Sequence, residues 1–221
     1  MTSHPEERAR ARARMVETQL VRRGIRDPRI LEAFRRVPRE EFVSESLAPE
    51  ALEDGPLPIG AGQTISQPYV VAWMLELLRL SPEETLLDVG TGSGYAAAIA
   101  SSLVSRVVSV ERIASLADTA RTRLARLGFD NVTVHVGDGS LGHAALAPYE
   151  AIMVGAAAPR VPEALVAQLA VGGRMVVPVG PREDAQELVR VMREGPDDVR
   201  VEAMGGVRFV PLVGGEGYAP G

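Results

Sequence analysis

Residues 85–95 read Thr85-Leu-Leu-Asp-Val-Gly-Thr-Gly-Ser-Gly-Tyr95, and this stretch decides the fold. The apolar run that ends at Val89 predicts a short buried strand. Glycines at 90, 92 and 94 then allow a tight turn and let a ligand approach the backbone. The apolar segment from Tyr95 predicts a helix whose first free N–H groups can face an anion. Strand, glycine turn and helix together predict the first half of a βαβ unit.

Strands and helices are expected to alternate on the C-terminal side of this turn. Apolar runs predict strands at 106–111, 131–137, 149–156 and 172–180, and helices at 95–103, 114–127 and 162–169. Such alternation implies a mostly parallel sheet. The runs at 188–192 and 201–213 lack an intervening helix, which favours antiparallel strands at a sheet edge. We therefore predict an α/β fold, Rossmann-like and doubly wound, with helices on both faces and antiparallel C-terminal strands.

The N-terminal part predicts a helical extension and a long loop. A capping box at Ser3–Glu6 opens one helix that Gly24 ends, and Asp27-Pro28 starts another. Residues 49–68 are rich in proline and glycine, so we expect an ordered, packed loop before a helix at 70–80. The chain is therefore divided into N-terminal helices with an active-site loop (1–80), a ligand-binding core (81–213) and a flexible tail (214–221).

Composition limits the function classes. Among 221 residues there is no cysteine and there are three scattered histidines, which excludes disulfides and thiolate zinc sites and argues against any metal site. A net charge of −5 argues against nucleic acid as the main partner, so the basic N-terminal segment is interpreted as a solvated helix face. No signal peptide or membrane-length apolar run is found, so a cytoplasmic protein that binds no membrane is expected.

The spacing of the glycine loop indicates its ligand. The dinucleotide fingerprint needs a third glycine where this chain has Tyr95. Asp88 precedes the loop, and a carboxylate there would repel a pyrophosphate but attract an ammonium group. A ligand with both an ammonium and a carboxylate is therefore favoured, as in the methionine part of S-adenosylmethionine.

Two acidic residues at later strand ends extend this hypothesis. Glu111 ends the second strand, where a carboxylate can accept two hydrogen bonds from a ribose diol. Gly137-Asp138-Gly139 ends the third strand, where Asp138 could accept from an adenine amino group. Taken alone, the first could be a surface acid and the second an ordinary turn. Following the glycine loop in order, they support a bound nucleoside.

Longer segments resemble the protein-L-isoaspartate O-methyltransferases, a family of class I S-adenosylmethionine-dependent methyltransferases. The resemblance covers roughly residues 15 to 213, and its specific parts are the TISQP loop at 64–68 and VPL at 210–212. One small departure is Glu150, where we would expect aspartate in a structural position. The segments that carry the resemblance are 19–43, GQTISQPYVVAWM (62–74), LDVGTGSGY (87–95), VVSVERI (107–113), VHVGDG (134–139), 150–180 and VRFVPL (207–212).

The resemblance implies a repair enzyme that methylates the free α-carboxyl group of isoaspartyl residues in damaged proteins and peptides. The ester then cyclises unaided to a succinimide, and the donor leaves as S-adenosylhomocysteine. Ser66 is implied as the catalytic residue, with Thr64, Ile65, Val210 and Leu212 on the substrate. The residues implied to hold the cofactor are Asp88, Gly90, Thr91, Gly92, Ser93, Gly94, Glu111, Arg112, Asp138 and Gly139. A monomer that needs no metal is expected.

The chemistry needs no general base, because an α-carboxyl group with a pKa near 3.5 is already ionised at neutral pH. Ser66 would orient one carboxylate oxygen; without the resemblance, its hydroxyl could equally belong to a turn or a helix cap. Three alternatives stay open. They are a related carboxyl or small-molecule methyltransferase, for example one acting on aspartate of a modified peptide, a nucleotide-binding dehydrogenase, and a binding module without catalysis.

Overall fold

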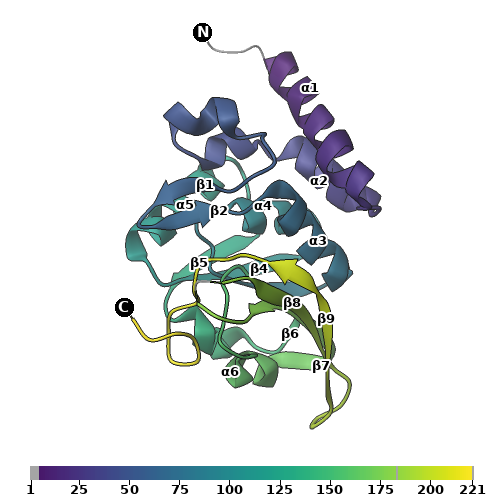
Figure 1. The fold of residues 1–221 in the computed structure, drawn as a ribbon, viewed down its shortest axis with the longest axis vertical. Helices are drawn as coiled ribbons and strands as arrows, with labels where there is room; N and C mark the ends of the chain where they lie inside the picture. Colours follow the sequence, from purple (N-terminus) through teal and green to yellow (C-terminus); the bar gives the residue numbers. More distant parts are fainter. Residues whose placement is uncertain (1–4, 183, 221) are drawn as a thin grey trace.

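The computed structural model describes residues 5–182 and 184–220, and its centre is a seven-stranded sheet (Figure 1). The strand order is β5-β4-β3-β6-β7-β8-β9. The strands are β3 (Thr85–Val89), β4 (Arg106–Glu111), β5 (Val132–Val136), β6 (Tyr149–Val154), β7 (Leu169–Val179), β8 (Gln186–Arg193) and β9 (Val199–Val207). Strands β3 to β7 pair in parallel, whereas β8 and β9 are antiparallel. The predicted fold class, including the antiparallel edge, is confirmed.

Helices cover the two faces of the sheet unequally. One face carries α3 (Pro68–Leu78), α4 (Tyr95–Ser101), α5 (Ala114–Arg126) and the N-terminal helices, while the other carries the short α6 (Glu163–Ala167) and two 3-10 turns, η5 (Gly139–Leu141) and η6 (Ala144–Leu146) (Figure 1). Neighbouring strand residues alternate between these layers, as Leu86 packs under the N-terminal helices and Leu87 packs on the α6 side. This burial on both faces explains the continuous apolar run that opens the glycine loop.

The N-terminal segment is helical, but not as one regular α-helix. It consists of α1 (Pro5–Met15), a π-helical turn η1 (Val16–Leu20) and a 3-10 turn η2 (Val21–Arg23), and Gly24 ends it with a φ of 99°. The predicted capping hydroxyl of Ser3 lies outside the described residues. Helix α2 (Pro28–Arg36) begins as predicted, because the carboxylate of Asp27 accepts a 2.9 Å hydrogen bond from the N–H of Arg29.

Residues 39–65 connect these helices to α3 and contain more structure than the predicted loop. They form two 3-10 turns, η3 (Arg39–Phe42) and η4 (Glu45–Glu50), followed by a hairpin of β1 (Leu57–Gly60) and β2 (Gln63–Ile65). Ala61 and Gly62 join its strands, with φ of 50° and 71°. The hairpin lies beside the start of α3, so it brings the TISQP segment over the carboxyl ends of the parallel strands (Figure 1).

Two further expectations concern Glu150 and the tail. Glu150 has the expected structural contact, since its carboxylate accepts a 2.8 Å hydrogen bond from the N–H of Thr85 on the neighbouring strand. The tail was expected to be flexible, but its first residues are packed: the N–H of Gly215 donates to Asp138 at 2.7 Å, and Glu216 accepts from Ala164 at 3.0 Å. Within residues 5–182 and 184–220, no helix is both long and apolar enough to cross a membrane.

Candidate active site

The glycine loop has the backbone conformation that its sequence requires. Gly90, Gly92 and Gly94 have φ of 83°, 53° and 89°, a region that residues with a side chain rarely adopt. The N–H of Gly90 donates to the carbonyl of Val110 at 2.9 Å, which fixes the loop against β4. The loop therefore leaves the end of β3 in a defined shape and opens α4 toward the space above the sheet.

Asp88 lies at the base of this loop and is almost wholly buried, with 2% of its surface exposed. Burial raises the pKa of its carboxyl group to about 6, although a 2.7 Å hydrogen bond from the Ser109 hydroxyl acts in the opposite direction. A buried carboxylate without a cation is costly, so a ligand ammonium would stabilise its ionised form. The predicted role of Asp88 is thus chemically consistent with its surroundings.

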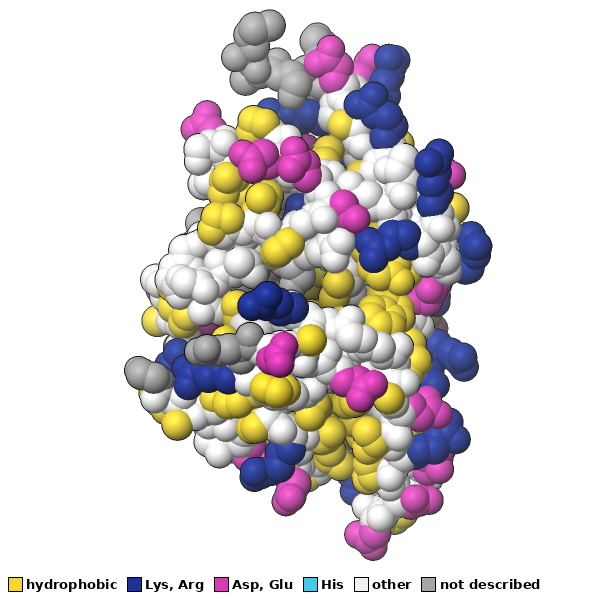
Figure 2. Space-filling view, viewed as in Figure 1, with side chains coloured by type: hydrophobic (Ala, Val, Ile, Leu, Met, Phe, Trp, Pro, Cys, Tyr) yellow, Lys and Arg dark blue, Asp and Glu magenta, His cyan; other side chains and the backbone are white. Residues whose placement is uncertain are grey.

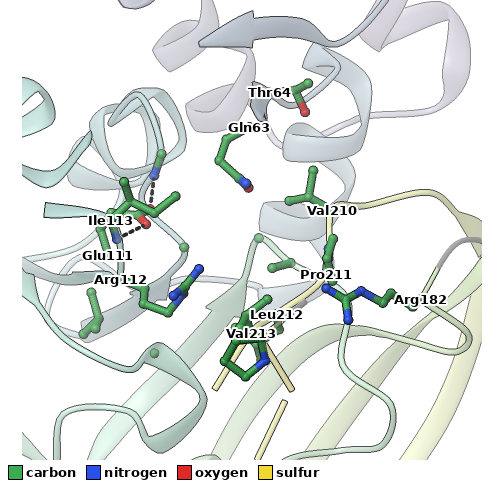
Figure 3. A pocket seen from close by; sticks show the side chains of 17 residues that line it. Gln63, Thr64, Glu111, Arg112, Ile113, Arg182, Val210, Pro211, Leu212 and Val213 are labelled. Atoms are coloured by element: carbon green, nitrogen blue, oxygen red, sulfur yellow. Dashed lines mark hydrogen bonds between the residues drawn. The ribbon is translucent and has the colours of Figure 1, made fainter. Parts of the chain in front are cut away.

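Glu111 links the loop to the end of β4. One carboxylate oxygen accepts from the N–H of Gly92 and the other from the N–H of Ile113, both at 2.9 Å (Figure 3). Each carboxylate oxygen can accept more than one hydrogen bond, so Glu111 retains acceptor capacity toward a diol. In the structure, Glu111 holds the glycine loop through the hydrogen bond from Gly92, a role that the sequence had not predicted.

A cavity of about 460 Å³ lies above these residues, within the range of roughly 300–1,000 Å³ that is usual for small-molecule sites. We call it the cofactor cavity, because residues predicted to bind the cofactor line it. Glu111 and Arg112 bound it on one side and Val210 on the other, and Gln63 points down into it from the hairpin (Figure 3). Gln63 and Arg182 are lining residues that the sequence analysis missed. Gln63 lies in the segment GQTISQPYVVAWM that carries the resemblance but was given no role, and Arg182 lies outside the quoted segments.

Asp138 is not among the residues that line this cavity, and its predicted contact with adenine stays a prediction. Its carboxylate accepts from the N–H and hydroxyl of Ser140 at 2.9 and 2.7 Å and from the N–H of Gly215 in the tail at 2.7 Å. Neighbouring Gly139 does line the cavity, but a side chain there would first meet Val89 at 2.7 Å. Close packing against Val89 on β3 is therefore sufficient to explain why position 139 has no side chain.

Ser66 lies between two cavities, and nearby Thr64 also reaches the 460 Å³ cavity. A small junction cavity of about 40 Å³ is lined by Ser66 and Ile65 together with Asp88 and the glycine loop. Ser66 also lines a third cavity on the outer side, and Thr64 lines all three. The TISQP segment therefore lies between the cofactor cavity and this third cavity, and Ser66 lines both the junction cavity and the third one.

Arg39 fixes the backbone of this segment from below. Its side chain is fully buried, with 0% of its surface exposed, and burial lowers the pKa of its guanidinium group. The guanidinium donates to the carbonyls of Ala51, Gly55 and Ser66, the last two at 3.0 Å. It also lies 5.8 Å from the ring centroid of Tyr95, the first residue of α4. Arg39 thus contacts both the substrate loop and the helix that follows the glycine loop.

Comparisons with known proteins identify the family. The family model described as protein-L-isoaspartate (D-aspartate) O-methyltransferase matches residues 10–217. The protein-L-isoaspartate O-methyltransferase of Protochlamydia amoebophila is 56% identical over 204 residues, which cover 92% of this chain and 97% of that protein. This chain belongs to the protein-L-isoaspartate O-methyltransferase family. A Pelobacter propionicus relative, protein-L-isoaspartate O-methyltransferase 2, is 57% identical over 204 residues, covering 92% and 91% of the two chains.

Solved structures agree with this assignment. A protein-L-isoaspartate O-methyltransferase structure aligns with a TM-score of 0.84 at 31% identity, covering 93% of this chain and 66% of that longer chain. A Plasmodium falciparum structure in complex with S-adenosyl-L-homocysteine aligns with a TM-score of 0.78 at 26% identity, covering 91% and 98%. The predicted family, enzyme class and S-adenosylmethionine-dependent chemistry are confirmed.

The positions of the predicted site residues in this isoaspartate methyltransferase can now be compared. All of them except Gly94 and Asp138 line at least one of the three cavities. Gly94 packs instead against α5, since a side chain there would meet Leu124 at 3.3 Å. Leu212 lines the cofactor cavity, but its own N–H and carbonyl pair with Ala157 and Tyr218 at 2.7 Å. The individual roles of these residues stay predictions.

Proposed function

We propose that this chain methylates the free α-carboxyl group of L-isoaspartyl residues in damaged proteins, with Ser66 orienting the acceptor. The observation that carries the proposal is the junction cavity, which Ser66 and the glycine loop line together. Any acceptor group held at Ser66 would therefore be next to the residues that hold the methyl donor. When bound, S-adenosylmethionine supplies a methyl group on a positively charged sulfur.

The residues around the cofactor cavity fit such a donor. Asp88 would bind the ammonium group, and the backbone of Gly90 to Gly92 would pass close to the methionine end. Glu111 would accept from the ribose hydroxyls, and Arg112 extends from the same strand end into the cavity (Figure 3). We assign the base to the wall near Gly139, because the Asp138 carboxylate is already engaged by Ser140 and Gly215.

The acceptor side needs orientation and not deprotonation. An α-carboxyl group is ionised at neutral pH, with a pKa of about 3.5. Among the described residues that line the junction cavity, Asp88 and Tyr95 are the ones that titrate. They belong to β3 and to the start of α4, on either side of the glycine loop. The Ser66 hydroxyl would donate a hydrogen bond to one carboxylate oxygen, while Ile65 and Phe209 exclude water. Alignment and desolvation would then supply the rate enhancement.

We further propose a monomer of the cytoplasm that binds neither nucleic acid nor membrane. The net charge of −5 supports this, as does the way the basic N-terminal face is neutralised. Arg12 pairs with Glu40 at 2.6 Å and Arg36 with Glu32 at 2.7 Å. Blue side chains are the more frequent along this edge of the molecule, and magenta ones lie among them (Figure 2). A mixed surface of this kind is typical of a solvated helix face and not of an RNA-binding arm.

The test is methyl transfer to a matched pair of peptides that differ only in an isoaspartyl or an aspartyl residue. We expect base-labile methyl ester on the isoaspartyl peptide alone, at one ester per isoaspartate. Transfer to both peptides, or to the aspartyl peptide alone, would favour a related carboxyl methyltransferase. No transfer to either, with S-adenosylhomocysteine still bound in calorimetry, would favour a small-molecule acceptor.

A further inference from the structure

A third cavity opens from the acceptor site toward the surface. It measures about 500 Å³, and Thr64, Ser66 and Val210 belong both to its lining and to that of the inner cavities. Its other walls come from the start of α3 and from the segment that follows β9. These two elements lie side by side, and apolar side chains are exposed between them (Figures 1 and 2). We call this cavity the outer groove.

Aromatic side chains from α3 line the outer groove. Tyr69 and Trp73 are one helical turn apart, and their rings stack at 6.1 Å with an angle of 19°. Gly205 on β9 leaves room for this arrangement, because a side chain at that position would meet the Trp73 ring at 3.2 Å. Phe209 adds a third ring beside the acceptor site. The wall is therefore apolar and suited to the aliphatic part of a side chain.

The charge of the outer groove is opposite to that of the whole protein. Its lining includes Arg23 and Arg208, and no acidic residue belongs to that part of it which the structure describes. Arg23 lies 3.5 Å over the ring of Tyr69 and pairs with Asp54 at 3.1 Å. Arg208 is exposed, and its side chain has no ion-pair partner within residues 5–182 and 184–220. The positive charge of Arg208 is thus available to a ligand.

We propose that the outer groove binds the residues that flank the isoaspartate in the substrate chain, and that it selects acidic side chains through Arg208, with Arg23 in support. This rests on the proposed function, because Ser66 must hold the isoaspartate at the inner end of the groove. The groove measures about 500 Å³ and opens from the acceptor site, so it can receive residues next to the isoaspartate. Their aliphatic stems would pack on Tyr69 and Trp73, and a terminal carboxylate would meet the guanidinium groups.

The test uses isoaspartyl peptides that share one neutral sequence and differ at a single flanking position. Glu, Gln or Lys is placed one or two residues before or after the isoaspartate, and kcat/KM is measured for each. On one side of the isoaspartate we expect the order Glu, Gln, Lys, with a Glu-to-Lys ratio of roughly fivefold to tenfold that shrinks in high salt. Equal values for Glu and Lys at every position would overturn the proposal.

Charge reversal then assigns the selectivity to the groove. Arg208→Glu should invert the Glu-to-Lys ratio, and Arg208→Gln should reduce it. The matched control is Arg106→Glu, an exposed arginine at the opposite end of the sheet that makes the same change in net charge. Arg106→Glu should retain the wild-type ratio; the same inversion in both variants would mean a general field and would contradict the groove. A neutral peptide that accepts no methyl group at all would instead overturn the proposed function.

Discussion

Arg39 donates a hydrogen bond of 3.0 Å to the backbone carbonyl of Ser66, from a position that is wholly buried. The same guanidinium also donates to the carbonyls of Ala51 and Gly55, so one side chain connects three backbone positions that are distant from it in sequence. Arg39 therefore holds the backbone of a residue that lines the junction cavity. The orientation of the acceptor site therefore depends on a residue that lines none of the three cavities.

The first prediction follows for Arg39→Met, which keeps the length of the side chain and removes its donors. A buried carbonyl left without a partner costs about 1–3 kcal/mol, so we expect the free energy of unfolding to fall by about 3 kcal/mol in urea denaturation. Peptide turnover should fall at least tenfold at a temperature where the variant is folded, since Ser66 loses its anchor. S-adenosylhomocysteine affinity should stay within about threefold, because Arg39 contacts no residue proposed to bind it.

Arg174→Met is the matched control for this loss. Arg174 also binds backbone carbonyls, including that of Arg79 at 2.7 Å, and it pairs with Glu84 at 2.6 Å, but it lies at the amino ends of the strands. We expect a similar loss of stability with unchanged turnover below the unfolding transition. If Arg39→Met lost stability and kept full turnover, as this control should, Arg39 would be structural only.

The sequence was sufficient to predict the glycine loop, but it did not indicate that Arg39 belongs to the site. The conformation of residues 88–95 is local, so the glycines, the preceding acid and the apolar flanks were sufficient to predict it. The mostly parallel sheet followed from the alternation of strands and helices, but the order of its strands was not predicted. Arg39 stands between helical segments with many exposed arginines, and nothing in its neighbours indicates burial. Its contacts depend on carbonyls brought there by tertiary folding.

The same reasoning explains two other features of the structure that the sequence did not indicate. The hairpin β1–β2 consists of strands of 4 and 3 residues with Pro58 inside, too short for a strand period to be recognised. The hydrogen bonds that engage the Asp138 carboxylate were not predicted either. The group that engages it, the N–H of Gly215, is 77 residues away in sequence. Contacts at this separation leave no trace in local composition.

A second prediction concerns Ser66→Ala. One hydrogen bond to a charged group contributes roughly 1.5–3 kcal/mol, and each 1.4 kcal/mol corresponds to a factor of ten in rate. We therefore expect kcat with an isoaspartyl peptide to fall about 10- to 100-fold, with S-adenosylhomocysteine affinity nearly unchanged in calorimetry. Ser44→Ala, at an exposed serine outside the three cavities, should alter neither quantity. Equal loss of turnover and cofactor affinity at Ser66 would indicate a structural role.

Glu111 gives a third prediction, because its carboxylate has two functions. Glu111→Ala removes the acceptor proposed for the ribose and also the acceptor for the N–H groups of Gly92 and Ile113. We expect S-adenosylhomocysteine affinity to fall by at least about tenfold, and Glu111→Gln should lose less since one acceptor oxygen remains. Glu83→Gln, at an exposed acid just before β3 and so at the amino ends of the strands, is the control. Unchanged affinity in Glu111→Ala would remove the ribose assignment.

The pKa of Asp88 leads to the fourth prediction, on cofactor binding. Burial raises this pKa from 3.8 to about 6, so the carboxyl group of the free protein takes up a proton as pH falls through 6. An ammonium group attracts the ionised form alone. Calorimetry from pH 8 to pH 5 should therefore show S-adenosylhomocysteine affinity decreasing below about pH 6. Asp88→Asn should bind more weakly at pH 8 and lose this dependence.

The titration of Asp88 should also affect the stability of the free protein, but with the opposite pH dependence: stability should fall as pH rises, whereas cofactor affinity should increase. Because the pKa of Asp88 is higher in the folded state, the folded state holds the proton more tightly than the unfolded state between pH 3.8 and about 6. The free energy of unfolding contributed by this group must then fall as pH rises through that window, by at most about 1.4 kcal/mol per pH unit. Other carboxyl groups titrate there too, so the quantity to measure is the difference between wild type and Asp88→Asn in urea denaturation. That difference should change with pH. A constant difference would mean that the pKa of Asp88 is the same in the folded and unfolded states and that no ammonium is needed to stabilise its carboxylate.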